Sequence, residues 1–111
     1  MVKFLDLKKQ YIKLSKEINT TIKNVINETA FIGGKYVHKF EEEFAKYQNA
    51  KYCVGVANGT DGLELVLEAL NLKKGCEIIV PANSFISTAE AVSRTGHKVV
   101  FCDCNEDNYT I

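Results

Sequence analysis

From Lys51 onward, the sequence alternates between short runs rich in β-branched and apolar residues and longer runs with helical periodicity. The strand-like runs are 52–57, 77–80 and 98–102, and the helical runs are 63–72 and 85–95. Strands joined by single helices are parallel and are connected right-handedly. The alternation therefore predicts an α/β fold of β-α-β-α-β order, with the three strands side by side. Gly75 and Gly96 are expected just after the C-terminal ends of the two helices.

Two amphipathic helices are predicted ahead of this segment. Apolar residues recur every three or four positions from Leu7 to Val25 and again from Val37 to Tyr47, which places them on one side of a helix. Asp6 is the expected N-cap of the first helix. The second helix also carries three consecutive glutamates, which point about 100° apart on a helix and are expected to be solvated: Glu41, Glu42 and Glu43.

We expect residues 1–111 to form a single, incomplete domain, with a helical lead-in at 1–50 and the βαβαβ segment at 51–111. A parallel sheet normally needs helices over both of its faces. Three strands with two crossover helices leave an open edge, and a chain of this length buries only about two thirds of its unfolded surface even in a closed fold.

Charge and hydropathy exclude several classes of partner. Fourteen Lys and Arg balance fourteen Asp and Glu, and the pI is near 6.7, so bulk charge predicts binding neither to nucleic acid nor to an anionic membrane. Uninterrupted apolar runs are only a few residues long, far below the roughly 20 needed to span a bilayer. No apolar stretch follows Met1 and Lys3, so we expect no secretory signal and a cytoplasmic location.

The cysteines and histidines give no sign of a metal site or a catalytic centre. The cysteines contain no C-x-x-C pair, so buried, reduced thiols are expected at Cys53, Cys76, Cys102 and Cys104. His38 and His97 have no Cys, Ser or carboxylate partner at a catalytic spacing, and both are expected on the surface.

The loop at 56–62 leaves a predicted strand, turns on glycine and enters a strongly patterned helix. Amides at a helix start lack intrahelical partners and suit a phosphate, while the Thr60 hydroxyl can add a hydrogen bond. Equally, Thr60 or Asp61 can simply cap the helix while Gly59 supplies a turn with positive φ. The glycine spacing matches neither G-x-G-x-x-G nor the P-loop, so a dinucleotide or P-loop NTPase site is not predicted.

A second loop, at 80–89, also runs from the C-terminal end of a strand into a helix. Both loops therefore open on the same edge of the predicted sheet, where open α/β folds bind ligands. The ring of Phe85 can cover a flat heterocycle whose phosphate is held by the first loop. Its alternative role is an apolar contact in the core or at the start of the helix.

In order and spacing, four segments resemble the beginning of the DegT/DnrJ/EryC1/StrS family of pyridoxal-phosphate-dependent nucleotide-sugar aminotransferases. They are FLDLKKQY, FIGGKYVHKFEEEFAKY, YCVGVANGTDGLELVLEAL and the run from GCEIIV to the last residue. The blocks GTDGL and PANSF are the most specific parts. The resemblance covers nearly the whole chain.

The resemblance implies that the chain is the N-terminal portion of the large domain of a fold-type I transferase. It also implies a homodimer that transfers an amino group, usually from glutamate, to a keto group of a nucleotide-linked sugar. The cofactor implied is pyridoxal 5′-phosphate. Thr60 and Asp61, through their backbone amides and the Thr60 hydroxyl, match positions that hold its phosphate, in a cradle that begins at Gly59. Phe85 matches the aromatic position on its ring. In such sheets the first strand is separated from the next two, so the segment 52–57 would lack its neighbour.

The resemblance also places the Schiff-base lysine and the aspartate that pairs with the pyridine nitrogen downstream of Ile111. We therefore expect no catalytic residue within 1–111 and no turnover by this segment alone. Two alternatives stay open: a non-catalytic α/β module that binds a phosphate ligand, and the remnant of a truncated gene.

Overall fold

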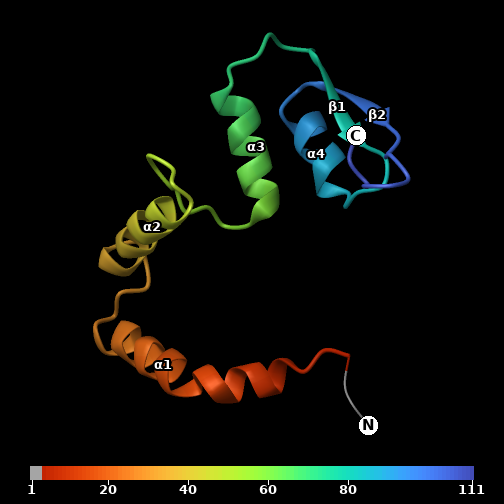
Figure 1. The fold of residues 1–111 in the computed structure, drawn as a ribbon. Coiled ribbons are helices and arrows are strands. Elements are labelled where there is room, and N and C mark those ends of the chain that lie inside the picture. The colour runs from red at the N-terminus through yellow and green to blue at the C-terminus, as the bar shows by residue number, and fades with distance from the viewer. Residues whose placement is uncertain (1–3) are drawn as a thin grey trace. The chain divides into compact units, whose positions relative to one another are not determined.

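The computed structural model describes residues 4–111, so Met1 and Lys3, which underlie the expected lack of a secretory signal, lie outside the described part. The chain divides into two compact units, Met1–Gly55 and Val56–Ile111, which are described separately. Figure 1 follows their elements along the chain: α1 and α2 in the first unit, then α3, β1, α4 and β2 in the second. None of the helices within 4–111 combines the length and the hydropathy needed to cross a membrane.

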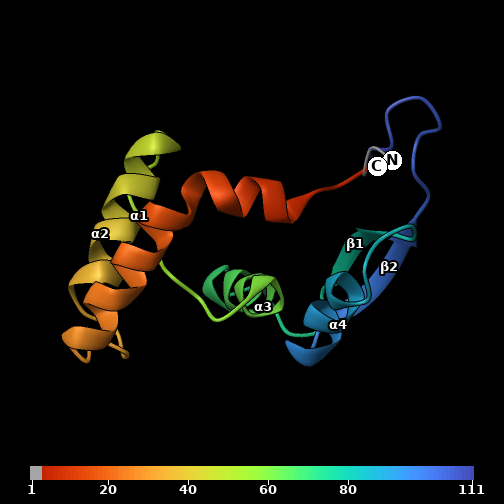
Figure 2. The ribbon, with the colours of Figure 1, turned by 90° about the horizontal axis from the view of Figure 1, so that it is seen from below.

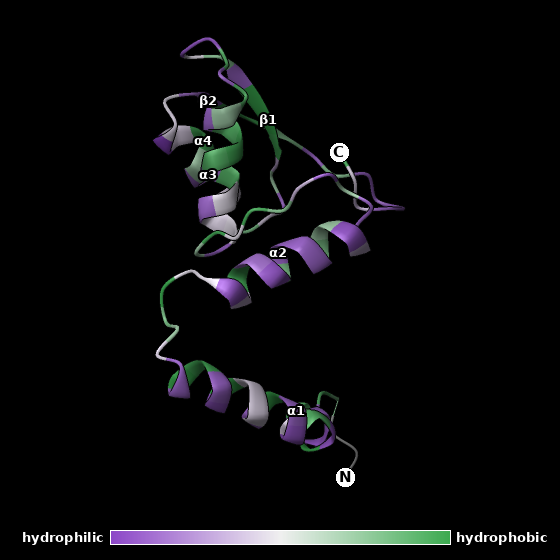
Figure 3. Cartoon of the chain, turned by 90° about the vertical axis from the view of Figure 1, so that its left-hand side faces the viewer, coloured by the Kyte–Doolittle hydropathy of each residue, from purple (hydrophilic) through white to green (hydrophobic). Residues whose placement is uncertain are grey.

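The first unit contains the two predicted amphipathic helices, α1 (Leu7–Asn27) and α2 (Lys35–Tyr47). Asp6 caps α1 as predicted, because its Oδ1 accepts the Lys9 N–H at 3.0 Å. Figure 3 shows hydrophobic and hydrophilic bands on both helices. Their apolar side chains remain exposed: α1 buries none of its residues and α2 buries only Ala45.

An ion pair joins the end of α1 to the start of α2. Lys35 Nζ lies 2.8 Å from Glu28 Oε2. The hydrogen bond from Lys35 lowers the pKa of the Glu28 carboxyl, and the same bond raises the pKa of the Lys35 ammonium. Since the pKa of Glu28 is lower in the folded chain than in the unfolded one, the pair stabilises the chain above the unfolded pKa. That contribution is lost as the pH falls through the lowered folded value.

Replacing Lys35 with methionine is expected to raise the pKa of Glu28 toward its ordinary value, because the largest cause of the lowering is removed. Titration of the Glu28 side-chain carboxyl by NMR measures the shift. Lys39→Met is the matched control, since Lys39 pairs instead with Glu43, at 3.8 Å. An unchanged Glu28 titration in Lys35→Met would show that the ion pair does not form in solution.

The glutamate triplet of α2 is only partly solvated, which corrects the prediction for one of its members. Glu42 and Glu43 are exposed, but the Glu41 side chain is only 22% exposed. Its Oε1 accepts the backbone N–H of Gly55 at 2.7 Å. Glu41 therefore fastens the segment after α2 back onto the helix, a contact that the local sequence pattern does not reveal.

The second unit has a β-α-β unit at its centre, formed by β1 (Glu77–Pro81), α4 (Ser87–Arg94) and β2 (Lys98–Cys102). The strands are parallel, as predicted, with Glu77 opposite Lys98 and Pro81 opposite Cys102. Figures 1 and 2 show α4 beside both strands, and the contacts of α4 with each strand agree. The buried side chains of this unit gather where α4 meets the sheet: Val80, Ala91 and Val92, with the polar Ser87.

The three-stranded arrangement is wrong for the segment 52–57. Within the described residues the sheet has two strands, and 52–57 pairs with neither. Tyr52 and Val54 are 74% and 76% exposed. A strand exists only where another backbone lies beside it, and the expectation drawn from the family resemblance, that this segment lacks its neighbour, agrees with the structure.

The helix before β1 begins and ends earlier than predicted. Helix α3 spans Gly59–Ala69, and Asn71 rather than Gly75 follows its end in the left-handed conformation, with φ of 47°. Gly75 has φ of 78° in the next turn, where its N–H donates to Gly96 O at 3.2 Å. Gly96 follows the C-cap of α4 with φ of 79°, as predicted.

The histidines and cysteines differ in part from expectation. His38 is exposed as predicted, but His97 is half-buried, and its Nδ1 is enclosed without a hydrogen-bond partner among residues 4–111. The backbone N–H of His97 donates to Val92 O at 3.0 Å, which draws the turn after α4 inward. The four cysteines are free, as expected, but only half-buried.

Candidate functional site

The start of α3 is capped by Asn58 and not by Thr60 or Asp61, the caps expected from the sequence. Asn58 is extended, with φ of −164°, and its Oδ1 accepts the Asp61 N–H at 2.9 Å. Asp61 Oδ2 in turn accepts the Ala57 N–H at 3.2 Å. Gly59 is the first helical residue and does not have a positive φ. The cap is therefore Asn58, and the hydroxyl of Thr60 is left available for another partner.

This cap leaves two amides without an acceptor at the positive end of the helix. The Asp61 N–H is used by Asn58, but no acceptor among residues 4–111 contacts the N–H of Gly59 or Thr60. Unpaired amides at a helix N-terminus carry a partial positive charge and bind anions. Of the three positions expected to hold a phosphate, Gly59 and Thr60 each keep an amide without an acceptor among residues 4–111. Asp61 uses its amide in the cap.

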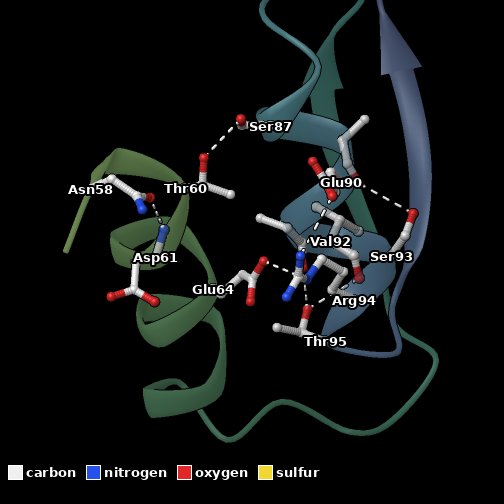
Figure 4. A network of polar contacts seen from close by, with 12 residues as sticks. Asn58, Thr60, Asp61, Glu64, Ser87, Glu90, Val92, Ser93, Arg94 and Thr95 are labelled. Atoms are coloured by element: carbon white, nitrogen blue, oxygen red, sulfur yellow. Dashed lines mark hydrogen bonds and ion pairs between the residues drawn. The ribbon is translucent and has the colours of Figure 1, made fainter. Parts of the chain in front are cut away.

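The hydroxyl of Thr60 reaches across to the helix of the second loop. Thr60 Oγ1 donates to Ser87 Oγ at 2.8 Å, between residues 27 apart in the sequence. Figure 4 shows the two side chains pointing toward each other from α3 and α4. Ser87 is 9% exposed, and the hydrogen bond is partly buried. It joins the start of α3 to the start of α4.

Phe85 lies on the surface, not in the core. It is 76% exposed, so the alternative of a buried apolar contact does not apply. It lines a pocket of about 330 Å³ together with residues from both loops: Gly59, Thr60, Leu63, Ser87 and Thr88. Asp61 does not line this pocket and contributes instead to a polar one with Glu64, Glu90 and Arg94. The structure therefore brings Gly59, Thr60 and Phe85 together and places Asp61 beside them.

A second contact between α3 and α4 was not found from the sequence. Arg94 Nε lies 2.8 Å from Glu64 Oε1, and Arg94 Nη1 lies 3.5 Å from Glu90 Oε1. The i, i+4 spacing of Glu90 and Arg94 on one helix indicates an ion pair between them. The sequence does not indicate that Arg94 also pairs with Glu64 on α3. This ion-pair group links the two helices below the Thr60 and Ser87 contact (Figure 4).

The pocket offers donors and a flat apolar ring. No carboxylate of residues 4–111 lines it, and within the same residues the amides of Gly59 and Thr60 have no acceptor. Its volume lies at the lower end of the range of about 300–1,000 Å³ that is typical of small-molecule sites. These properties fit a small, flat, phosphate-bearing molecule, whose dianion would lie at the start of α3 and whose ring would lie against Phe85.

Comparisons with known proteins agree on one family. The family model described as the DegT/DnrJ/EryC1/StrS aminotransferase family matches residues 12–111. The dTDP-3-amino-3,6-dideoxy-alpha-D-galactopyranose transaminase of Aneurinibacillus thermoaerophilus is 39% identical over 111 residues, which are 100% of this chain and 31% of that protein. The chain thus spans about a third of the length of this curated relative.

Two solved structures are similar in fold as well as in sequence. The crystal structure of DesV from S. venezuelae is 39% identical, with a TM-score of 0.88 over 96% of this chain and 29% of that chain. NtdA from Bacillus subtilis, solved with the bound cofactor PMP, is 32% identical, with a TM-score of 0.83 over 94% of this chain and 24% of that chain. The fold described above is therefore that of the corresponding part of these proteins.

Proposed function

The chain belongs to the DegT/DnrJ/EryC1/StrS aminotransferase family, and from this membership we propose that residues 1–111 form the cofactor-phosphate site of an aminotransferase. The cofactor is pyridoxal 5′-phosphate, and the substrate is a nucleotide-linked sugar with a keto group. The transaminase of A. thermoaerophilus, which bears the name of a dTDP-linked amino sugar, supports this substrate class. Glutamate as amino donor, a homodimer and a cytoplasmic location complete the proposal.

Beside family membership, the observation that supports the proposal is the pocket at the start of α3. There an exposed aromatic ring lies with two amides that have no acceptor among residues 4–111. The amides of Gly59 and Thr60 are assigned to the cofactor phosphate, and Phe85 to one face of its pyridine ring. Asp61 fixes the loop, because its N–H and its carboxylate are both used in capping the helix. When bound, the cofactor supplies the electron sink for amino-group transfer.

The residues of this chain act by holding and orienting. The amides at the start of α3 would hold a dianion without moving and so would orient the ring attached to it. Phe85 would shield one face of that ring from water. The covalent and proton-transfer steps require an amine and an acid, which we assign to other parts of the enzyme.

A hybrid enzyme tests the proposed function. Residues 1–111 replace the matched segment of the A. thermoaerophilus transaminase, and the purified hybrid is assayed for retained pyridoxal 5′-phosphate and for amination of the dTDP-linked keto sugar. We expect a folded hybrid that retains the cofactor and shows activity. A folded hybrid that retains no cofactor would contradict the proposal, and one that retains cofactor but is inactive would contradict the substrate class.

A further inference from the structure

Acidic side chains line a polar pocket beside the proposed phosphate site. Its lining residues come from α3, from the turn before α3 and from α4: Asn58, Thr60, Asp61, Glu64, Glu90 and Arg94. Thr60 also lines the pocket that contains Phe85, so the two pockets meet at this residue. A phosphate is a dianion, and negative charges close to its site weaken its binding. The carboxylates of the polar pocket therefore oppose the proposed function unless a cation compensates them.

Glu64 is the carboxylate that follows Thr60 by one helical turn. Residues four apart on a helix lie on the same side, about 5–6 Å apart between their Cβ atoms. Both side chains face α4, since Thr60 contacts Ser87 and Glu64 contacts Arg94. A phosphate on the Thr60 amide would therefore lie within roughly one Debye length of Glu64, which is about 10 Å at 0.1 M salt. At that separation the two would repel each other.

Arg94 is the cation of this pocket. No other Lys, Arg or His among residues 4–111 lines it. Arg94 Nε lies 2.8 Å from Glu64 Oε1, and Arg94 Nη1 lies 3.5 Å from Glu90 Oε1. The Glu64 side chain is only 20% exposed, so water screens its charge less than it screens a fully exposed carboxylate. Figure 4 shows Arg94 reaching from α4 toward Glu64.

We propose that Arg94 compensates the carboxylates of Glu64 and Glu90 and thereby keeps the start of α3 able to hold a phosphate dianion. The proposal rests on the proposed function and deepens it, because it assigns a residue that sets the affinity of that site without touching the ligand. Exposed ion pairs contribute little to stability. The main consequence of this one is therefore the local electric field and not the joining of two helices.

Two substitutions that break the same ion pair distinguish a charge effect from a structural one. Arg94→Met removes the positive charge and leaves the carboxylates uncompensated, so the affinity for a phosphate is expected to fall. Glu64→Gln removes a negative charge and leaves Arg94 in place, so the affinity is expected to rise. If the pair acted only by joining α3 to α4, both substitutions would weaken binding.

Two further variants serve as controls. Arg94→Lys retains the charge, and its affinity is expected to stay near that of the wild type. Lys73→Met makes the same change of charge as Arg94→Met at an exposed residue beyond the far end of α3. Because α3 has 11 residues and is therefore about 16 Å long, Lys73 lies more than a Debye length from the phosphate site. This variant is expected to bind like the wild type.

Binding of pyridoxamine 5′-phosphate, which has no aldehyde to react with lysines, tests the proposal. Dissociation constants are measured by calorimetry on the hybrid enzyme and by NMR titration of the chain. At 0.1 M salt, Arg94→Met is expected to weaken binding about three- to tenfold, and Glu64→Gln to strengthen it about two- to threefold. At 1 M salt, where the Debye length is about 3 Å, both changes are expected to fall below about twofold. Pyridoxamine, which lacks the phosphate, is expected to bind all variants equally.

Several results would overturn the role of Arg94. Weaker binding in both Arg94→Met and Glu64→Gln, a loss in Arg94→Met that persists at 1 M salt, or an equal loss for pyridoxamine would each show that the ion pair acts structurally. If the wild type shows no preference for pyridoxamine 5′-phosphate over pyridoxamine in either protein, the proposed cofactor site itself fails. If that preference is present while Arg94→Met binds like the wild type, only the inference about Arg94 fails.

Discussion

Replacing Val92 with aspartate is expected to unfold the unit Val56–Ile111. Val92 is 2% exposed and is the largest fully buried side chain of the described residues. A carboxylate there has no partner, and burying an unpaired charge is among the most destabilising changes in a protein core. We expect a loss of more than about 4 kcal/mol, which is enough to unfold a small unit whose two-stranded sheet has open edges.

Amide hydrogen exchange in β1 and β2 measures this effect. Both strands are expected to lose their protection in Val92→Asp, because α4 covers them. Val66→Asp makes the same chemical change on α3 at a side chain that is 59% exposed, and it is expected to keep the protection. Normal protection in Val92→Asp would mean that α4 does not pack on the sheet as described.

Replacing Gly59 with proline is expected to weaken binding of pyridoxamine 5′-phosphate by about 10- to 100-fold, the cost of one hydrogen bond to a charged group. Proline removes one of the two free amides. It suits this position, because the first helical residue needs no N–H partner in the helix. It also requires an extended residue before it, and Asn58 has φ of −164° and ψ of 178°. The change therefore deletes a donor and preserves α3.

Gly59→Ala tests whether binding depends on the amide of residue 59 or on the absence of a side chain there. It retains the N–H, and a Cβ at this position meets nothing within 4 Å, so binding is expected to stay within about threefold of the wild type, well below the cost of a lost hydrogen bond. Both variants are compared by NMR titration, with their α3 amides as the check on folding. Wild-type affinity in Gly59→Pro would remove the Gly59 amide from the phosphate site.

The elements of the fold could be predicted where the signal is local. The helix stripes, the cap at Asp6, the β-α-β unit and the glycine after α4 each depend on residues a few positions apart, and the structure has all of them. The cap at Asn58 was also within reach, since asparagine is among the preferred N-cap residues. The strand predicted at 52–57 was not decidable in this way, because strand formation depends on a neighbouring backbone that periodicity does not reveal.

The candidate site, like the fold, was predictable only where its features depend on residues close together in the sequence. Glycine placement and the two loop motifs were enough to identify Gly59, Thr60 and Phe85 as candidates, because these features are encoded in consecutive residues. Asp61 as a phosphate-holding position came from the family resemblance. The placement of both loops on one edge of a sheet assumed a strand at 52–57 that the sheet does not contain. Only the tertiary structure decided which amides stay free, that Phe85 is exposed, and that Thr60 meets Ser87 while Glu64 meets Arg94. Those contacts join side chains far apart in the chain, so their partners are determined by how α3 packs against α4.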